Sequence, residues 1–188
     1  MTIEISKEYK ASLIPFPKET LEPLNLPKET FDFLTEVGLP LHASYEITAN
    51  GSLSFFEEPY IKKISHLQNT CLYIASMDMM GQLAVDIKSQ EVYQIQKGHE
   101  DRWGNSVEIP VFTNNSIGQF VECLGLWLSF YPQFRDEVAK NLTIDPEFSL
   151  FEHEEMYKPI LQKLKAVDPE ALKWRKYFWR RMCEPDII

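Results

Sequence analysis

The stretch that decides the fold class is QLAVDIKSQEVYQIQ, residues 82–96. Its first half alternates between apolar and polar side chains over Leu83–Ile87, which is the two-residue period of a strand with one buried face. Its second half, Val92–Ile95, is rich in β-branched and aromatic residues, which favour strands. Because only a short polar segment separates the halves, we predict that they pair as an antiparallel hairpin, 82–88 with 91–96.

Further strand patterns flank this hairpin on both sides. The candidate strands cover residues 53–56, 60–66, 71–76 and 107–113. A loop with two glycines, residues 97–106, joins the hairpin to the last of them. Consecutive strands with short connections predict an antiparallel β-meander in the middle of the chain.

The N-terminal part reads differently. A helix is predicted from Pro27 to Val37, because proline suits the start of a helix and Gly38 and Pro40 end it. Residues 1–26 contain three prolines and show no clear period, so we expect an extended or partly mobile segment there.

The last third predicts several helices. Apolar residues recur at helical spacing over 117–128, and we expect Pro132 to interrupt this helix, with a shorter continuation over 134–142. Asp145-Pro146-Glu147 and Asp168-Pro169-Glu170 each place a capping acceptor before a proline, which predicts two further helix starts.

Length and composition fit one folded domain. The chain has 188 residues, of which 44% are hydrophobic, enough to bury a core. The order of elements predicts an α+β fold: a central antiparallel β-meander flanked by an N-terminal helix and several C-terminal helices. We expect residues 27–188 to form this single domain and residues 1–26 to be the segment before it.

The formal net charge of −9 limits the possible functions. Residues 1–140 hold 19 acidic and 11 basic side chains, whereas residues 141–188 hold 9 and 8. Binding along a nucleic acid needs an excess of cations, so we expect no direct nucleic-acid contact. The acidic body suits association with a cationic partner, or it merely keeps the chain soluble; both alternatives stay open.

No pattern for catalytic, cofactor-binding or metal-binding residues stands out. His99-Glu100-Asp101 and His153-Glu154-Glu155 both lack the second histidine of a metal-binding helix. Cys71, Cys123 and Cys183 lie far apart, which argues against a zinc site and for a reducing compartment. The first residues lack the apolar run of a signal peptide, and the longest apolar stretch is too short for a membrane span. We therefore expect a cytoplasmic, non-enzymatic protein without cofactor, metal or membrane contact.

A basic and aromatic segment, Lys173–Arg181, has two interpretations. As one helix it would align Ala171, Trp174, Phe178 and Met182 toward the core and leave its cations in water. We favour this packing role, and contact with a partner is the alternative.

Four segments of the sequence follow one another in a characteristic order and spacing. They are FLTEVGLP (33–40), DMMGQLAVD (78–86) running on to Glu91-Val92-Tyr93, FTNNSI (112–117) followed by Phe120-Val121, and Asp168-Pro169-Glu170-Ala171 with Phe178-Trp179. Together they resemble the SUKH superfamily, in particular its fourth subgroup, over roughly residues 27 to 184. The resemblance implies a compact, mainly bacterial α+β domain. It also implies an immunity protein that neutralises a polymorphic toxin, frequently a nuclease or a deaminase.

The resemblance implies no catalytic set. It marks fold-setting positions at Gly38, Pro40, Asp78, Gly81 and Asp86. The chain departs from the family in one place, because its hairpin turn, residues 88–91, lacks the usual glycine.

The leading hypothesis is stoichiometric occlusion of a cationic protein toxin, with acidic groups standing in for the phosphates of the toxin's substrate. The candidate interface combines carboxylates with aromatic and arginine anchors, which interfaces favour. Its residues are Glu57, Glu58, Tyr60, His99, Glu100, Asp101, Arg102 and Trp103. Ordinary loops are the alternative for this interface, and an intracellular regulatory or scaffold module or an enzyme with an unrecognised site is the alternative for the function. The sequence leaves the oligomeric state open.

Overall fold

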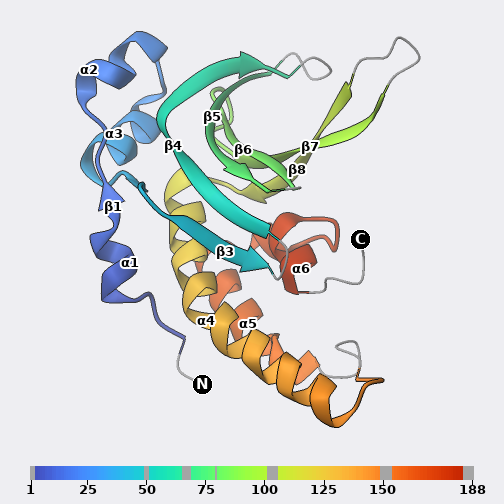
Figure 1. Ribbon diagram of the computed structural model, residues 1–188. Helices are drawn as coiled ribbons and strands as arrows, with labels where there is room; N and C mark the ends of the chain where they lie inside the picture. Colours follow the sequence, from blue (N-terminus) through green and yellow to red (C-terminus); the bar gives the residue numbers. More distant parts are fainter. Residues whose placement is uncertain are drawn as a thin grey trace.

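A six-stranded antiparallel sheet forms the centre of the protein, with strand order β3-β4-β5-β6-β7-β8 (Figure 1). The computed structural model describes residues 3–48, 51–64, 69–78, 80–100, 106–148 and 154–183. The strands are β3 (Ser44–Thr48), β4 (Gly51–Lys63), β5 (Thr70–Met77), β6 (Gly81–Asp86), β7 (Val92–Glu100) and β8 (Ser106–Asn114). Each strand pairs with its neighbour in sequence, so the predicted meander is confirmed.

The structure corrects the predicted strand boundaries. The strands predicted at 53–56 and 60–66 are one strand, β4, with a register shift between Phe55 and Tyr60. Residues 97–100 and 106 of the loop predicted over 97–106 are strand, because β7 continues to Glu100 and β8 begins at Ser106, and residues 101–105 lie outside the described residues. Strand β3 has no clear sequence pattern, since only Ile47 in it is buried.

The turn between β6 and β7 forms without a glycine. Gln90 takes the left-handed conformation there, with φ of 65°. The Asp86 carboxylate accepts hydrogen bonds from the backbone N–H groups of Lys88 and Ser89, at 2.7 and 2.9 Å. The side chain of a buried aspartate therefore holds the turn at which the resemblance implied a glycine.

Two glycines are fixed by close backbone approach. Gly38 and Gly81 have φ of +83° and +103°. A Cβ at Gly38 would lie 1.9 Å from the carbonyl oxygen of Ile14, and one at Gly81 would lie 2.0 Å from that of Ile95. No other residue fits either position, so this fold requires glycine at both.

Helices cover one face of the sheet. They are α1 (Lys7–Ala11), α2 (Lys18–Leu21), α3 (Lys28–Glu36), α4 (Ile117–Ile144), α5 (Lys158–Val167) and α6 (Phe178–Cys183), with 3₁₀ turns η1 (Glu22–Leu24), η3 (Glu154–Met156) and η4 (Glu170–Leu172). The helix predicted after Pro27 is confirmed as α3. The main hydrophobic core lies between α4 and this face of the sheet.

Helix α4 runs through Pro132, which contradicts the predicted interruption. Proline in a helix interior costs about 3 kcal/mol through a lost hydrogen bond and a steric clash. Phe130, Tyr131 and Phe134 on both sides of Pro132 are buried, and burial of such side chains returns about 1.5–3 kcal/mol each. The helix therefore continues past Pro132, because the burial of these aromatic side chains outweighs the cost of the proline.

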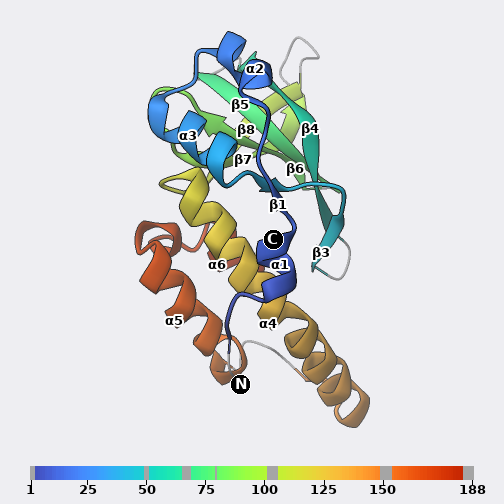
Figure 2. The same cartoon turned by 90° about the vertical axis from the view of Figure 1, so that its left-hand side faces the viewer.

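The N-terminal residues pack on the body of the protein (Figure 2). Residues 7–11 and 18–24 are helical rather than extended, and Leu13–Ile14 (β1) pairs with Leu39–Pro40 (β2). The Tyr9 hydroxyl donates a 2.8 Å hydrogen bond to the carbonyl oxygen of Val121 in α4. Four side chains of this segment are buried in the main core: Ile3, Tyr9, Phe16 and Leu21.

The C-terminal part differs from the prediction in two places. Asp145 ends helix α4, and residues 146–147 form a turn instead of a helix start. Residues 173–177 also turn, so α6 begins only at Phe178. For this reason Trp174 is 55% exposed rather than aligned with buried Phe178.

Candidate functional site

The sheet curls until side chains of two non-adjacent strands meet. The Lys62 ammonium in β4 contacts the Glu108 carboxylate in β8, although three strands separate them. In a flat sheet these strands would lie four spacings apart, about 19 Å. The contact therefore defines an inner face of the curl, on the side away from the main core, and Figure 1 shows β4 arching over the other strands.

A row of cross-strand partners, aromatic except for Ala84, runs from this inner face to Phe112, which packs against the main core. Successive cross-strand partners from β4 to β8 are Tyr60, Tyr73, Ala84, Tyr93 and Phe112. The rings of Tyr60 and Tyr73 stack with centroids 5.3 Å apart, and those of Tyr93 and Phe112 meet edge to face at 6.0 Å. Tyr73 and Ala84, in the middle of the row, are fully buried and form a second hydrophobic cluster with Ile64, Cys71 and Ile95, whereas Tyr60 at the β4 end of the row is 40% exposed.

Two oxygen atoms on the inner face have no hydrogen-bond partner among the described residues. They are the Tyr73 hydroxyl and Glu108 Oε2, and both are buried. Burial, and after it the charge of Glu108, raises the pKa of Tyr73 above its ordinary value, so the phenol stays protonated. Lys62 Nζ lies 5.5 Å from the centre of the Tyr73 ring.

The predicted β4 residues divide between two places. Tyr60 lies on the aromatic row, is 40% exposed, and accepts a 3.0 Å hydrogen bond from the Gln82 side-chain amide. Glu57 and Glu58 are exposed in the irregular part of the strand, where Glu57 Oε1 lies 3.0 Å from His42 Nδ1. The structure thus places only Tyr60 on the inner face beside Glu108's partner Lys62.

The predicted residues of the β7–β8 hairpin are only partly described. His99 and Glu100 end strand β7, and Glu100 pairs in register with Ser106. Asp101, Arg102 and Trp103 lie outside the described residues. The Lys62–Glu108 contact joins this hairpin to β4, so the two predicted segments come from neighbouring parts of the sheet.

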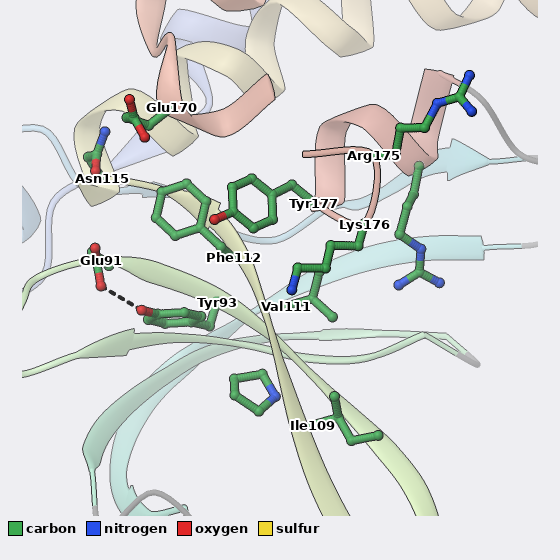
Figure 3. Close-up of a pocket in the computed structure, with 12 residues that line it drawn as sticks. Glu91, Tyr93, Ile109, Val111, Phe112, Asn115, Glu170, Arg175, Lys176 and Tyr177 are labelled. Atoms are coloured by element: carbon green, nitrogen blue, oxygen red, sulfur yellow. Dashed lines mark hydrogen bonds between the residues drawn. The ribbon is translucent and has the colours of Figure 1, made fainter. Parts of the chain in front are cut away.

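A groove of about 790 Å³ lies along the outer strand β8 and was not predicted as a site (Figure 3). Its walls combine Phe112 and Tyr177, whose ring centroids are 4.9 Å apart, with the cations Arg175, Lys176 and Arg181. Burial lowers the pKa of Arg181. The basic residues of Lys173–Arg181 were the sequence signal for this groove. They were predicted to lie on one helix, and that helix would not have formed the groove.

The described residues hold no group of three or more histidine, cysteine or acidic side chains able to bind a metal. Burial raises the pKa of Cys71 and of Cys123 to about 12, which leaves both thiols protonated and unreactive.

Comparison with protein families gives the identification. The model of the SUKH-4 immunity protein family matches residues 8–185, nearly the whole chain. The chain belongs to the SUKH-4 immunity protein family. Immunity proteins of this kind are not enzymes, which agrees with the sequence-based expectation. No curated protein and no solved structure matches the chain.

Two of the segments that resemble SUKH-4 proteins meet in the structure. Asn114, at the end of β8, donates a hydrogen bond to buried Asp168 at 3.0 Å, and its amide oxygen accepts one from the Trp179 indole at 2.8 Å. These contacts fix the C-terminal helices against the sheet edge. Among the described residues, no helix of this SUKH-4 chain is both long and apolar enough to span a membrane.

Proposed function

We propose that this protein binds one cognate toxin with fixed stoichiometry and neutralises it by covering the toxin's substrate site. The observation that carries the proposal is the match to the SUKH-4 immunity protein family over residues 8–185. Exposed Tyr60 at the β4 end of the aromatic row supports it, because an aromatic side chain beside charged neighbours such as Lys62 suits a protein interface.

The toxin acts on nucleic acid or nucleobases, as a nuclease or a deaminase. Such an enzyme needs cations around its substrate cleft, because it holds phosphates. The acidic body of this chain complements that charge, with 19 acidic and 11 basic side chains in residues 1–140. Carboxylates of Glu57, Glu58 and the segment 99–103 take the places of substrate phosphates.

Co-expression with the toxin encoded by the neighbouring reading frame tests the proposal. The wild-type protein is expected to restore growth, and calorimetry is expected to give one binding event at a fixed molar ratio. Growth arrest despite soluble expression would contradict it. Copurification with a housekeeping protein of the same cell, without toxin protection, would favour the regulatory or scaffold alternative.

A further inference from the structure

The inner face contains an unfilled pair of hydrogen-bonding groups. Tyr73 is fully buried, yet its hydroxyl has no partner among the described residues, and neither has buried Glu108 Oε2. Buried polar atoms of native proteins are nearly always paired, so each such atom needs an explanation. The need is greatest for a carboxylate oxygen, because a buried charged group without a hydrogen-bond donor costs more free energy than a neutral one.

Lys62 shows that both groups belong to one site. Its ammonium contacts the Glu108 carboxylate and lies 5.5 Å from the Tyr73 ring centre, which places a cation between a carboxylate and an aromatic face. The neighbouring ring of Tyr60 stacks on Tyr73 at 7° between planes. The site therefore has the two parts that recognise a side-chain cation, an acid and an aromatic wall.

We propose that Glu108 and Tyr73 form a socket for one arginine side chain of the partner toxin, with Lys62 covering the socket in the free protein. The inference rests on the proposed function and names a contact within it.

A guanidinium group fits the socket better than a second ammonium group. It carries five donors in a plane, so it can donate to Glu108 Oε2 and to the Tyr73 oxygen together while its face stacks on an aromatic ring. The Lys62 side chain is 48% exposed and so has room to move into solvent when the guanidinium enters. The socket then gains the partners that its two oxygens lack.

Titration with ethylguanidinium chloride, followed by amide NMR shifts, tests the socket without the toxin. Saturable shifts are expected at Tyr73 and Glu108, whereas n-butylammonium and sodium chloride at equal ionic strength are expected to shift these amides less. Glu108→Gln is expected to weaken the binding about tenfold or more, as for the loss of a charged hydrogen bond. Equal responses to ethylguanidinium and sodium chloride would overturn the proposal.

Two matched lysine variants distinguish displacement of Lys62 from a general effect of net charge. Lys62→Met and Lys63→Met change the net charge equally, and Lys63 is exposed in the same strand. Only Lys62→Met is expected to tighten ethylguanidinium binding, because only Lys62 covers the socket. Equal effects of both variants would show a general charge effect and contradict the proposal.

Binding to the toxin separates this inference from the proposed function. Glu108→Gln and, to a smaller degree, Tyr73→Phe are expected to speed dissociation of the toxin complex, while Glu137→Gln at the far end of α4 leaves it unchanged. If the wild-type protein neutralises the toxin and Glu108→Gln dissociates at the wild-type rate, the socket is wrong and the proposed function stands. If the wild-type protein fails to neutralise the toxin, the proposed function falls, and the ethylguanidinium titration still decides whether the socket exists.

Discussion

Asn114 and Asp168 lie 54 residues apart in sequence and 3.0 Å apart in space, joined by a buried hydrogen bond. The Asp168 carboxylate also accepts from the backbone and side-chain N–H groups of Asn115, both at 2.8 Å, and from the Glu170 backbone at 3.2 Å. One fully buried side chain thus satisfies the end of β8, the start of α4 and the turn η4. The family segments around residues 114 and 168 depend on each other through this contact.

Replacement of this carboxylate tests its structural role. Asp168→Asn replaces one accepting carboxylate oxygen with an NH2 group, which is a donor and faces the donating groups of Asn114 and Asn115. We expect this change to lower the free energy of unfolding by about 3 kcal/mol. Urea denaturation measures the change. Asp145→Asn is the matched control, because exposed Asp145 accepts only a local 3.0 Å bond from the Glu147 backbone and should change stability by less than about 1 kcal/mol. Similar losses in both variants would contradict the role of the network.

Gly38→Ala is expected to prevent folding or to destabilise the protein by more than about 3 kcal/mol. The new methyl group would overlap the Ile14 carbonyl, and the φ of +83° strains any residue with a side chain. Gly118→Ala in α4 is the control, because its nearest contact is a side-chain carbon of Phe33 at 3.3 Å and alanine favours the helix by about 1 kcal/mol. Thermal unfolding of both variants gives the comparison, and a small loss for Gly38→Ala would contradict the overlap.

Local patterns predicted the elements whose signal lies within a few residues. The β6–β7 hairpin followed from alternating side chains, and α3 followed from Pro27 and Gly38. The uninterrupted α4 could not be predicted from Pro132 alone, because the aromatic packing that outweighs the proline comes from the tertiary structure.

The candidate site was predicted less completely than the fold. Tyr60 was named, but Tyr73 and Glu108 were not, because their importance arises from the curl that brings Lys62 to Glu108. That curl depends on register shifts in β4, β5 and β7, and a one-residue shift moves every later side chain to the other face. No single segment of the sequence determines the pairing register across five strands.

Pro132→Ala is expected to raise the free energy of unfolding by about 1–3 kcal/mol. Pro132 is exposed, so alanine removes the steric clash and restores a backbone donor without loss of packing. Exposed Gln133→Ala, beside it, should change stability by less than about 0.5 kcal/mol. Chemical denaturation with both variants tests this, and a destabilised Pro132→Ala would mean that the proline shapes a bend that the core needs.

Stability is expected to fall as the pH rises above 9. Burial raises the pKa of Cys71 and of Cys123 to about 12, so the unfolded chain loses these protons first and binds fewer protons than the folded protein. The loss amounts to about 1 kcal/mol for each thiol between pH 9 and pH 10, and the raised pKa of Tyr73 adds to it at higher pH. Urea denaturation at pH 8, 9 and 10 measures it. In Cys71→Ala the free energy of unfolding should fall less over this pH range, because the contribution of one thiol is missing. An unchanged decline would contradict the assignment.

Charge reversal at the predicted interface is expected to slow association with the toxin. Glu57→Lys/Glu58→Lys and Glu100→Lys/Asp101→Lys each remove attraction for a cationic partner, so the on-rate at low salt should drop about tenfold or more and its salt dependence should flatten. Glu137→Lys/Glu147→Lys, in the last turns of α4 and in the turn after it, has the same charge change on exposed residues and is the control. Stopped-flow association at several salt concentrations separates the cases. Because steering by the whole charge would slow all three variants alike, only a larger effect of the first two places the toxin at β4 and the β7–β8 hairpin.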